Sequence, residues 1–533
     1  MLRMTENSPD ASKQIARAAG TVMFAYILSN LAGLIRQMMV SNTFGTSQQL
    51  DAFYAAVTVP DFLFNLLAGG ALASAFIPIF TDLLKQRTTR EAFSLASAVV
   101  SLILLLLGSG SLLTTFFAPQ VVSRVLFVFK PELDPLTRNL SIDLLRIILI
   151  APTIFGISGI VMGILNTHQK FLVPALAPVA NWLGWILGIL LFVPSMGIYG
   201  LAWGYVLGAI FHLGIQLPSL AKLPDFEFSL PSQLFGKDVI QVLRLVGPRL
   251  FGVGAVQVNF LVNTMLAASL AEGSLSAINV GRMVMTMPLF VIAQAIATAA
   301  LPTFSALVAK GQKEEMVTAL VSTLRGVLFL SLPASVGLIA MRSPITAVLF
   351  QRGNFDAHST ELVSWAILWF TAGLVGHALV EILSRAFYAL HDTKTPVSIG
   401  IGAMGLNVAF SFLFVWWFEK IGWMPHGGLA LANSLATAIE AVILVIAIRK
   451  PLGSLDIRLF MEGVIQFSLA SILMGVAVWG WLAFSDGFGA LVQTIGAVIA
   501  GLGVYSIVVI FMKNTEAVQL LNFALRRLGM GQV

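Results

Sequence analysis

Long apolar segments, separated by short polar ones, repeat along nearly the whole chain. Windows of twenty or more mostly apolar residues end at Pro, Gly or charged residues, a pattern typical of helices that cross a membrane. The pattern predicts fourteen such helices, at residues 20–45, 52–82, 92–118, 141–166, 174–194, 197–219, 238–268, 277–308, 317–341, 359–389, 396–417, 427–449, 462–484 and 488–512.

The composition agrees with this pattern. Of 533 residues, 58% are hydrophobic and 11% are charged, and the mean hydropathy is +0.91. A soluble domain has about 25% charged residues. The first apolar segment is too long for a cleaved signal peptide, so we expect it to remain as the first span. The sequence therefore predicts an all-α polytopic membrane protein without a soluble domain.

Basic residues predict the orientation in the membrane. Eighteen Lys and Arg lie in predicted loops on the side of the N-terminus, and six lie in loops on the other side. The positive-inside rule then places both termini in the cytoplasm. The pI near 9.6 follows from these loops, and we predict no nucleic-acid partner. The seven remaining arginines lie within or at the ends of spans: Arg36, Arg146, Arg244, Arg249, Arg282, Arg325 and Arg385.

Several kinds of chemistry are excluded. The chain has no Cys, which removes disulfides, thiolate metal sites and cysteine nucleophiles. Its six His lack the spacing of a zinc site on a helix, and no cofactor is predicted. A membrane enzyme that transfers glycans would need large outer loops with His, Asp or Glu. The longest predicted outer loop, residues 119–140, has no His, so we predict a transporter and not an enzyme.

One stretch of sequence occurs twice. Residues 71–84 read ALASAFIPIFTDLL and residues 295–308 read AIATAALPTFSALV, with six identities and five conservative changes in fourteen positions. Lys170 and Lys394 share the same offset of 224 residues, and a proline follows each. Chance recurrence in an Ala-rich chain is the alternative. The shared register favours a duplication of six spans, followed by two more.

The duplication predicts the domain organisation. Six is an even number, so both copies enter the membrane in the same direction, and the substrate cavity is expected between two parallel six-helix lobes. The predicted parts are a cytoplasmic tail at 1–19, lobes at 20–219 and 238–449, two additional helices within 462–512, and a second cytoplasmic tail at 513–533.

Charged residues inside the spans are candidates for function, because they are costly there. Counted from the outer ends of their spans, Arg36 lies about 12 Å deep and Asp61 about 13 Å deep. We expect them to form an ion pair that faces the cavity. In the alternative, Arg36 extends to the outer surface and Asp61 is neutral or hydrated.

Further polar residues have two interpretations each. Arg282 lies about 8 Å into its span and either lines a cavity or extends to the surface. Asp51 either binds substrate or favours a helix N-terminus. His377, Glu381 and Arg385 recur every four residues, as an ion path or as a helix-stabilising pair. Glu440 has no evident partner in the sequence and is a further candidate for coupling.

Three blocks of sequence resemble the MurJ/MviN lipid II flippases of the MOP exporter superfamily. They are Ser29 to Lys85 (SNLAGLIRQMMVSNTFGTSQQLDAFYAAVTVPDFLFNLLAGGALASAFIPIFTDLLK), Ile164 to Pro178 (ILNTHQKFLVPALAP) and Arg385 to Val397 (RAFYALHDTKTPV). Their order and spacing match the family over nearly the whole chain. Arg36 matches the family arginine of G-x-x-R, Arg282 matches that of span eight, and Asp51 matches the acid of D-A-F.

The resemblance implies a function in peptidoglycan biosynthesis and cell wall biogenesis. A monomer in the bacterial cytoplasmic (inner) membrane would move lipid II, the undecaprenyl-diphosphate-linked disaccharide pentapeptide, to the outer leaflet by alternating access. The resemblance also implies a central cationic cavity and a groove for the lipid tail at spans thirteen and fourteen. The driving force would be Na⁺, H⁺ or the membrane potential, and no metal site is assigned.

This sequence departs from the family pattern at candidate substrate-binding positions. Asn30 stands where the family has Arg, Asp61 stands where it has Asn, and Phe64-Asn65 stands where it has Arg-Arg. Fewer arginines should hold a diphosphate less tightly. The alternatives are therefore an exporter of another polyprenyl-linked glycan or amphipathic compound, and a transport-inactive scaffold for wall synthesis.

Overall fold

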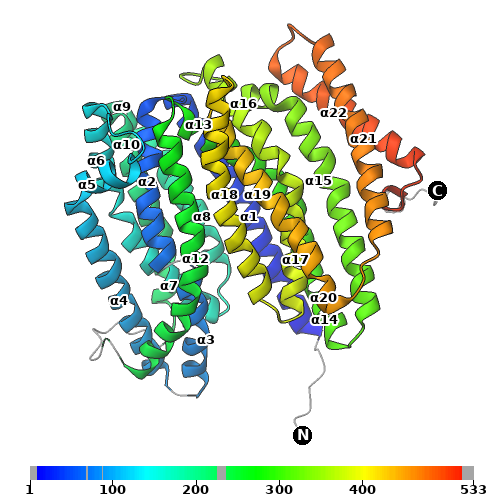
Figure 1. The fold of residues 1–533 in the computed structure, drawn as a ribbon. Helices are drawn as coiled ribbons and strands as arrows, with labels where there is room; N and C mark the ends of the chain where they lie inside the picture. Colours follow the sequence, from blue (N-terminus) through cyan, green and yellow to red (C-terminus); the bar gives the residue numbers. More distant parts are fainter. Residues whose placement is uncertain (1–8, 68–69, 87, 225–233, 235, 519–533) are drawn as a thin grey trace. The chain divides into compact units, whose positions relative to one another are not determined.

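The computed structural model describes residues 9–67, 70–86, 88–224, 234 and 236–518. All regular structure in these ranges is helical, which confirms the predicted all-α class. The chain forms two compact units, unit 1 (Met1–Glu272) and unit 2 (Gly273–Val533). Figure 1 shows their helices, blue to green in unit 1 and green to red in unit 2.

The helices of unit 1 are α1 (Pro9–Phe44), α2 (Gln48–Leu67), α3 (Gly70–Gln86), α4 (Thr89–Phe116), α5 (Ala118–Val121), the π-helical turn η1 (Val122–Leu126), α6 (Pro135–Ile148), α7 (Ala151–Thr167), α8 (Leu172–Leu191), α9 (Val193–Met196), α10 (Ile198–Gly214), α11 (Leu217–Ala221) and α12 (Lys237–Ser269). Those of unit 2 are α13 (Ser274–Leu289), the π-helical turn η2 (Phe290–Gln294), α14 (Ala295–Ala309), α15 (Lys313–Phe350), α16 (Ala357–Ala372), α17 (Leu374–Ala389), α18 (Lys394–Lys420), α19 (His426–Ala447), α20 (Arg449–Leu452), α21 (Ile457–Phe484) and α22 (Ala490–Phe511).

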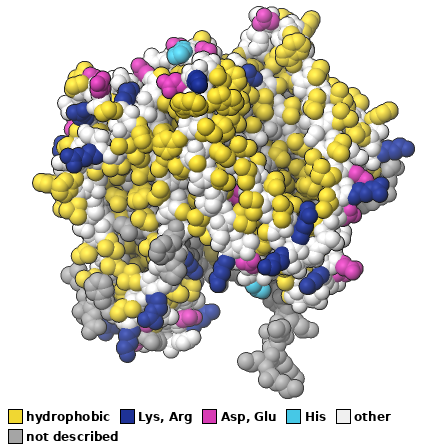
Figure 2. Space-filling model, in the orientation of Figure 1, with side chains coloured by type: hydrophobic (Ala, Val, Ile, Leu, Met, Phe, Trp, Pro, Cys, Tyr) yellow, Lys and Arg dark blue, Asp and Glu magenta, His cyan; other side chains and the backbone are white. Residues whose placement is uncertain are grey.

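The number of spans is close to the prediction. Within the described residues, 12 helices are long and apolar enough to cross a membrane, or 13 if α16 and α17, bent by 43°, form one span. The remaining predicted span, at residues 52–82, corresponds to α2 and α3 and is not confirmed, and residues 68–69 between these helices lie outside the described part. Figure 2 shows hydrophobic side chains over the outer faces of α4 in unit 1 and of α18 and α19 in unit 2, as lipid contact requires.

Two predicted helix ends differ from the structure. Helix α1 begins at Pro9 and its candidate membrane span begins at Met23, so residues 9–19 are helical, while the predicted cytoplasmic tail at 1–19 stays a prediction. Helix α15 continues to Phe350, past the predicted end at 341, which places Arg342 inside the helix and not in a loop. Pro344 is tolerated there, as prolines in membrane helices often are.

The repeated sequence forms equivalent helices in the two units. Residues 71–84 lie in α3 and residues 295–308 lie in α14. Phe80 and Phe304 occupy the same position of the repeat, and both side chains are fully buried. Helix α3 packs against α4 and α7, and α14 packs against α15 and α17. The same three-helix core therefore occurs in each unit, as a duplication requires.

Helix α12 packs with the first unit. It contacts α2, α3 and α4, and the division between the units falls after Glu272. The predicted second lobe began at residue 238 and so included this helix. The contacts of α12 within unit 1 are not evident from its sequence, because an apolar helix carries no mark of the lobe against which it packs. The predicted lobe limits therefore stay a prediction.

Helices α8 and α10 approach each other closely through glycines. A Cβ atom added to Gly188 would lie 2.2 Å from the Cα atom of Gly204, and one added to Gly184 would lie 2.5 Å from the Cα atom of Gly208. Small residues spaced by four allow such backbone contact in membranes, where packing takes the place of the hydrophobic effect. This contact matters for function because α8 carries the aromatic residues described below.

We expect Gly188→Ala to destabilise the protein by about 1–3 kcal/mol, because the new methyl group would force α8 and α10 apart. The free energy of unfolding can be measured in mixed micelles with an increasing fraction of denaturing detergent. The matched control is Gly214→Ala, since a Cβ atom there meets nothing within 4 Å. Equal stability of the two variants would contradict the proposed close packing.

Candidate functional site

Arg36 lies against two tryptophan rings in unit 1. Its guanidinium carbon is 4.7 Å from the ring centroid of Trp182 and 4.7 Å from that of Trp185. Helix α1 contributes the arginine and α8 contributes both rings, and these two helices pack along each other. Contacts of this kind stabilise a cation by about 0.5–2 kcal/mol. We name Arg36, Trp182 and Trp185 the Arg36 cluster.

Neighbouring residues hold the rings in place. The indole Nε1–H of Trp182 donates a hydrogen bond to the hydroxyl of Ser29, with 3.2 Å between N and O. Gly33 leaves room for this ring, because a Cβ atom there would lie 3.5 Å from it. Trp185 packs against Tyr205 of α10, with ring centroids 5.1 Å apart. The guanidinium plane is therefore fixed by packing and not by an acidic side chain.

Two buried donors in the Arg36 cluster lack acceptors. Neither Nε of Arg36 nor Nε1 of Trp185 has a hydrogen-bond partner among the described residues. A buried donor left without an acceptor costs about 1–3 kcal/mol. The Arg36 cluster is therefore a buried cationic group with hydrogen-bonding capacity that no described side chain uses.

Asp61 has a different partner from the one predicted. The hydroxyl of Tyr205 donates a hydrogen bond to its carboxylate, with 2.7 Å between the oxygens. No ion pair joins Asp61 to Arg36 within the described part of the chain, so that prediction is wrong. Helix α2 begins at Gln48, which puts Asp61 about 20 Å along the helix and deeper than Arg36.

The other predicted residues of unit 1 lie apart from the Arg36 cluster. Asn30 is exposed, and its amide donates to the carbonyl of Tyr26 at 2.9 Å. Asn65 is half-buried near the end of α2. Asp51 lies in the first turn of α2, where a negative charge stabilises a helix N-terminus. Their proposed role in substrate binding stays a prediction.

In unit 2, Arg282 lies half-buried on α13. Its guanidinium donates to the side-chain oxygen of Asn279, one turn earlier, with 3.2 Å between N and O. Beside it, Gly281 packs closely on Ala366 of α16. Arg282 is thus held on a helix that packs within this unit.

The predicted stripe on α17 contains two separate contacts. Glu381 and Arg385 form an ion pair, with 2.6 Å between oxygen and nitrogen, and both side chains are about one-quarter exposed. The ring of His377 instead lies 3.0 Å from the side-chain oxygen of Asn433 on α19. Glu440, also on α19, packs against Gly400 of α18. No cluster of three or more His, Cys, Asp or Glu suited to a metal ion occurs among the described residues.

An apolar groove of about 670 Å³ lies between α15, α21 and α22. Its lining includes Pro333, Leu338, Val478 and Leu502, and its polar surface is small. The hydroxyl of Tyr505, also in the lining, donates to the carbonyl of Phe329 at 2.7 Å and so presents no free donor to the groove. The groove has the character expected of a site for a hydrocarbon chain.

A buried ion pair lies beside the part of the groove that is lined by residues following α22. Arg325 of α15 donates two hydrogen bonds to the carboxylate of Glu516, with N–O distances of 2.5 and 3.0 Å, and a third to the carbonyl of Leu459. The neighbouring Ala517 lines the groove. We name this pair the C-terminal latch. Sequence analysis missed it, because Glu516 falls in a segment predicted to be a tail.

Comparisons with known proteins give a consistent result. The family model described as "Lipid II flippase MurJ" matches residues 40–497. The lipid II flippase MurJ of Burkholderia cenocepacia is 30% identical over 493 residues, which cover 91% of this chain and 89% of that protein. The probable lipid II flippase MurJ of Vibrio cholerae is 30% identical, with 81% and 82% covered.

Solved structures agree with the sequence relatives. A lipid II flippase MurJ in an inward closed conformation superposes with a TM-score of 0.77 at 25% identity, covering 92% of this chain and 99% of that one. An inward-facing MATE multidrug transporter of the MOP superfamily gives a TM-score of 0.68 at 17% identity, covering 80% and 95%. The second likeness shows the fold alone.

Proposed function

The chain belongs to the MurJ family of lipid II flippases, and we propose that it moves lipid II from the inner to the outer leaflet of the bacterial cytoplasmic membrane. The observation that supports this most directly is the Arg36 cluster. It holds a cation on a family arginine position together with two buried donors that lack acceptors. A diphosphate would supply those acceptors.

The proposed role of the cluster follows from the shape of the guanidinium. Arginine presents its N–H donors in a rigid plane that matches two phosphate oxygens. Trp182 and Trp185 hold that plane, so less side-chain entropy is lost when the phosphate binds. A single fixed arginine therefore compensates in part for the arginines that Asn30 and Asn65 replace.

We propose that the groove between α15, α21 and α22 holds the polyprenyl tail. Burial of each CH₂ group from water is worth about 0.8 kcal/mol, but a tail that stays in lipid gains little from an apolar wall. The groove would therefore guide the tail and not bind it tightly. The head group alone would then need a polar path.

We further propose alternating access of the two lobes, with both termini in the cytoplasm and with the protein active as a monomer. Na⁺, H⁺ or the membrane potential would drive it. Glu440, His377 and the pair Glu381–Arg385 remain our candidates for coupling, because ionisable groups within spans commonly mark ion paths. Asp51, Asp61 and Arg282 remain candidates for contacts with the head group.

A second candidate is an exporter of another polyprenyl-linked glycan. The observation in its favour is the loss of arginines at Asn30 and Asn65 and the acid gained at Asp61. Rescue of a bacterium depleted of its own lipid II flippase tests both candidates. Growth with normal cell shape is expected from our proposal. Lysis, despite normal amounts of the protein in the membrane, would favour the other cargo.

We expect Trp182→Ala to raise the KM for lipid II transport roughly two- to thirtyfold with little change in the maximal rate, because a cation–π contact of about 0.5–2 kcal/mol is lost. Trp182→Phe should retain most of the affinity. Initial rates in liposomes at several lipid II concentrations measure this. Trp479→Ala is the control, since this ring is 70% exposed on α21. Equal KM values for all variants would remove Trp182 as a positioning residue.

A further inference from the structure

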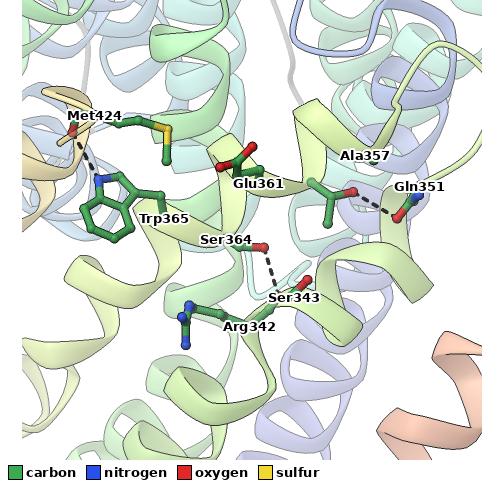
Figure 3. A pocket seen from close by; sticks show the side chains of 9 residues that line it. Arg342, Ser343, Gln351, Ala357, Glu361, Ser364, Trp365 and Met424 are labelled. Atoms are coloured by element: carbon green, nitrogen blue, oxygen red, sulfur yellow. Dashed lines mark hydrogen bonds between the residues drawn. The ribbon is translucent and has the colours of Figure 1, made fainter. Parts of the chain in front are cut away.

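A second polar cavity lies wholly within unit 2, where α15 joins α16. Its volume is about 440 Å³, within the range of sites for small ligands. The walls carry a cation, Arg342, an acid, Glu361, and the hydroxyls of Ser343, Thr360 and Ser364. Figure 3 shows Arg342 and Glu361 at separate points of this lining.

Three hydrogen bonds between different segments fix the walls of the cavity. The hydroxyl of Thr360 donates to the side-chain oxygen of Gln351, at 3.1 Å. The hydroxyl of Ser364 donates to the carbonyl of Arg342, at 3.5 Å, and the indole N–H of Trp365 donates to the carbonyl of Met424, at 3.0 Å. Each bond joins α16 to a neighbouring segment, so the cavity is formed before any ligand enters it.

The charges of the cavity are not neutralised by each other. Within the described residues, Arg342 has no ion pair, and its guanidinium donates to the carbonyl of Ile339 in its own helix, at 2.7 Å. Glu361 faces only His358, at 3.9 Å, and both of these side chains are about two-thirds exposed. Arginine has five N–H donors, so most of its hydrogen-bonding capacity stays available. A half-buried cation of this kind favours an anionic ligand.

We propose that this cavity binds a peptide that carries a carboxylate and an ammonium group, with Arg342 on the carboxylate and Glu361 on the ammonium. The hydroxyls of Thr360 and Ser364 already donate within the protein, so they would accept hydrogen bonds from its amide N–H groups. The identification of this peptide with the peptide part of lipid II rests on the proposed function. In the predicted orientation the α15–α16 connection is on the outer side, so the cavity would receive the peptide as the head group emerges.

The test uses the full-length protein in detergent micelles and a synthetic pentapeptide with an acetylated N-terminus, a free C-terminal carboxylate and one lysine. Titration calorimetry should show binding that Arg342→Gln weakens at least tenfold. Amidation of the peptide carboxylate should weaken binding equally, and Arg342→Gln should then have no further effect. Glu361→Gln should weaken binding of this peptide but not of one with alanine in place of lysine. Arg352→Gln, at an exposed position just after the same helix, is the control and should change nothing.

Two results would overturn the inference. One is equal binding of the acid and the amidated peptide to the unaltered protein. The other is displacement of the peptide by inorganic phosphate at equal concentration, which would indicate a site for any anion. Lipid II movement is measured separately in liposomes. If lipid II moves normally while Arg342→Gln leaves peptide binding unchanged, only this inference fails. If Arg342→Gln weakens peptide binding while the unaltered protein does not move lipid II, only the proposed function fails.

Discussion

Arg36→Gln should reduce lipid II transport roughly ten- to a hundredfold. A hydrogen bond to a charged group contributes about 1.5–3 kcal/mol, and each 1.4 kcal/mol is a factor of ten. Glutamine fits the space between Trp182 and Trp185 but offers no charge and no fork of donors. Arg36→Lys keeps the charge and loses only the planar fork of donors. Its rate of lipid II transport should therefore lie between that of the unaltered protein and that of Arg36→Gln.

The control for the Arg36 variants is Arg458→Gln. This arginine is 90% exposed, lies on α21 and is not part of the Arg36 cluster. Protein amount and unfolding behaviour are measured for every variant, so that a loss of transport is separated from a loss of folding. Normal transport by a well-folded Arg36→Gln protein would show that the head group is bound elsewhere.

Disruption of the C-terminal latch should have the largest effect on stability. Arg325→Met leaves Glu516 without its partner, and removal of one side of a buried ion pair costs roughly 3–5 kcal/mol. The double variant Arg325→Met, Glu516→Leu should recover most of this, because two apolar side chains can replace a buried pair. Equilibrium unfolding in mixed micelles measures each step.

The exposed pair Arg146–Asp143 in unit 1 provides the control for the latch. Its side chains are 46% and 49% exposed, so Arg146→Met should cost no more than about 1 kcal/mol. A double latch variant as unstable as the sum of its single variants would show that Arg325 and Glu516 act independently.

The latch also predicts a dependence on pH. Burial raises the pKa of Glu516, but hydrogen bonds from Arg325, Thr515 and its own amide outweigh burial, and the pKa lies below its ordinary value of 4.5. A lowered pKa means that the contribution to stability is present above pH 4.5. It is lost as the pH falls below 4.5 through the folded-state value. Glu516→Gln should remove this part of the acid dependence.

Much of the fold follows from the sequence, because membranes impose a simple rule. Each span must form its backbone hydrogen bonds within itself, so the length of an apolar segment alone locates most of the helices. The repeat at residues 71–84 and 295–308 also predicted that equivalent cores form around Phe80 and Phe304. The ends of the helices were harder to predict from the sequence. The start of α1 at Pro9 is not marked by a change in hydropathy, and α15 continues through the charged Arg342, beyond the predicted end of its span at residue 341.

The candidate site is less visible in the sequence because its partners are distant along the chain. Arg36 could be identified as a charge within a span, but its contacts with Trp182 and Trp185 depend on how α1 packs against α8. Apolar spans commonly contain tryptophans with no such role. The predicted ion pair with Asp61 failed because depth was counted from a helix start placed four residues too late.

The central claim is that this protein itself moves lipid II and uses Arg36 to do so. Purified protein in liposomes, with lipid II detected separately in each leaflet, tests it most directly. We expect movement of lipid II with the unaltered protein, much slower movement with Arg36→Gln, and normal movement with Arg458→Gln. Lipid II that stays in its original leaflet with the unaltered protein, or that moves equally fast with Arg36→Gln, would contradict the account.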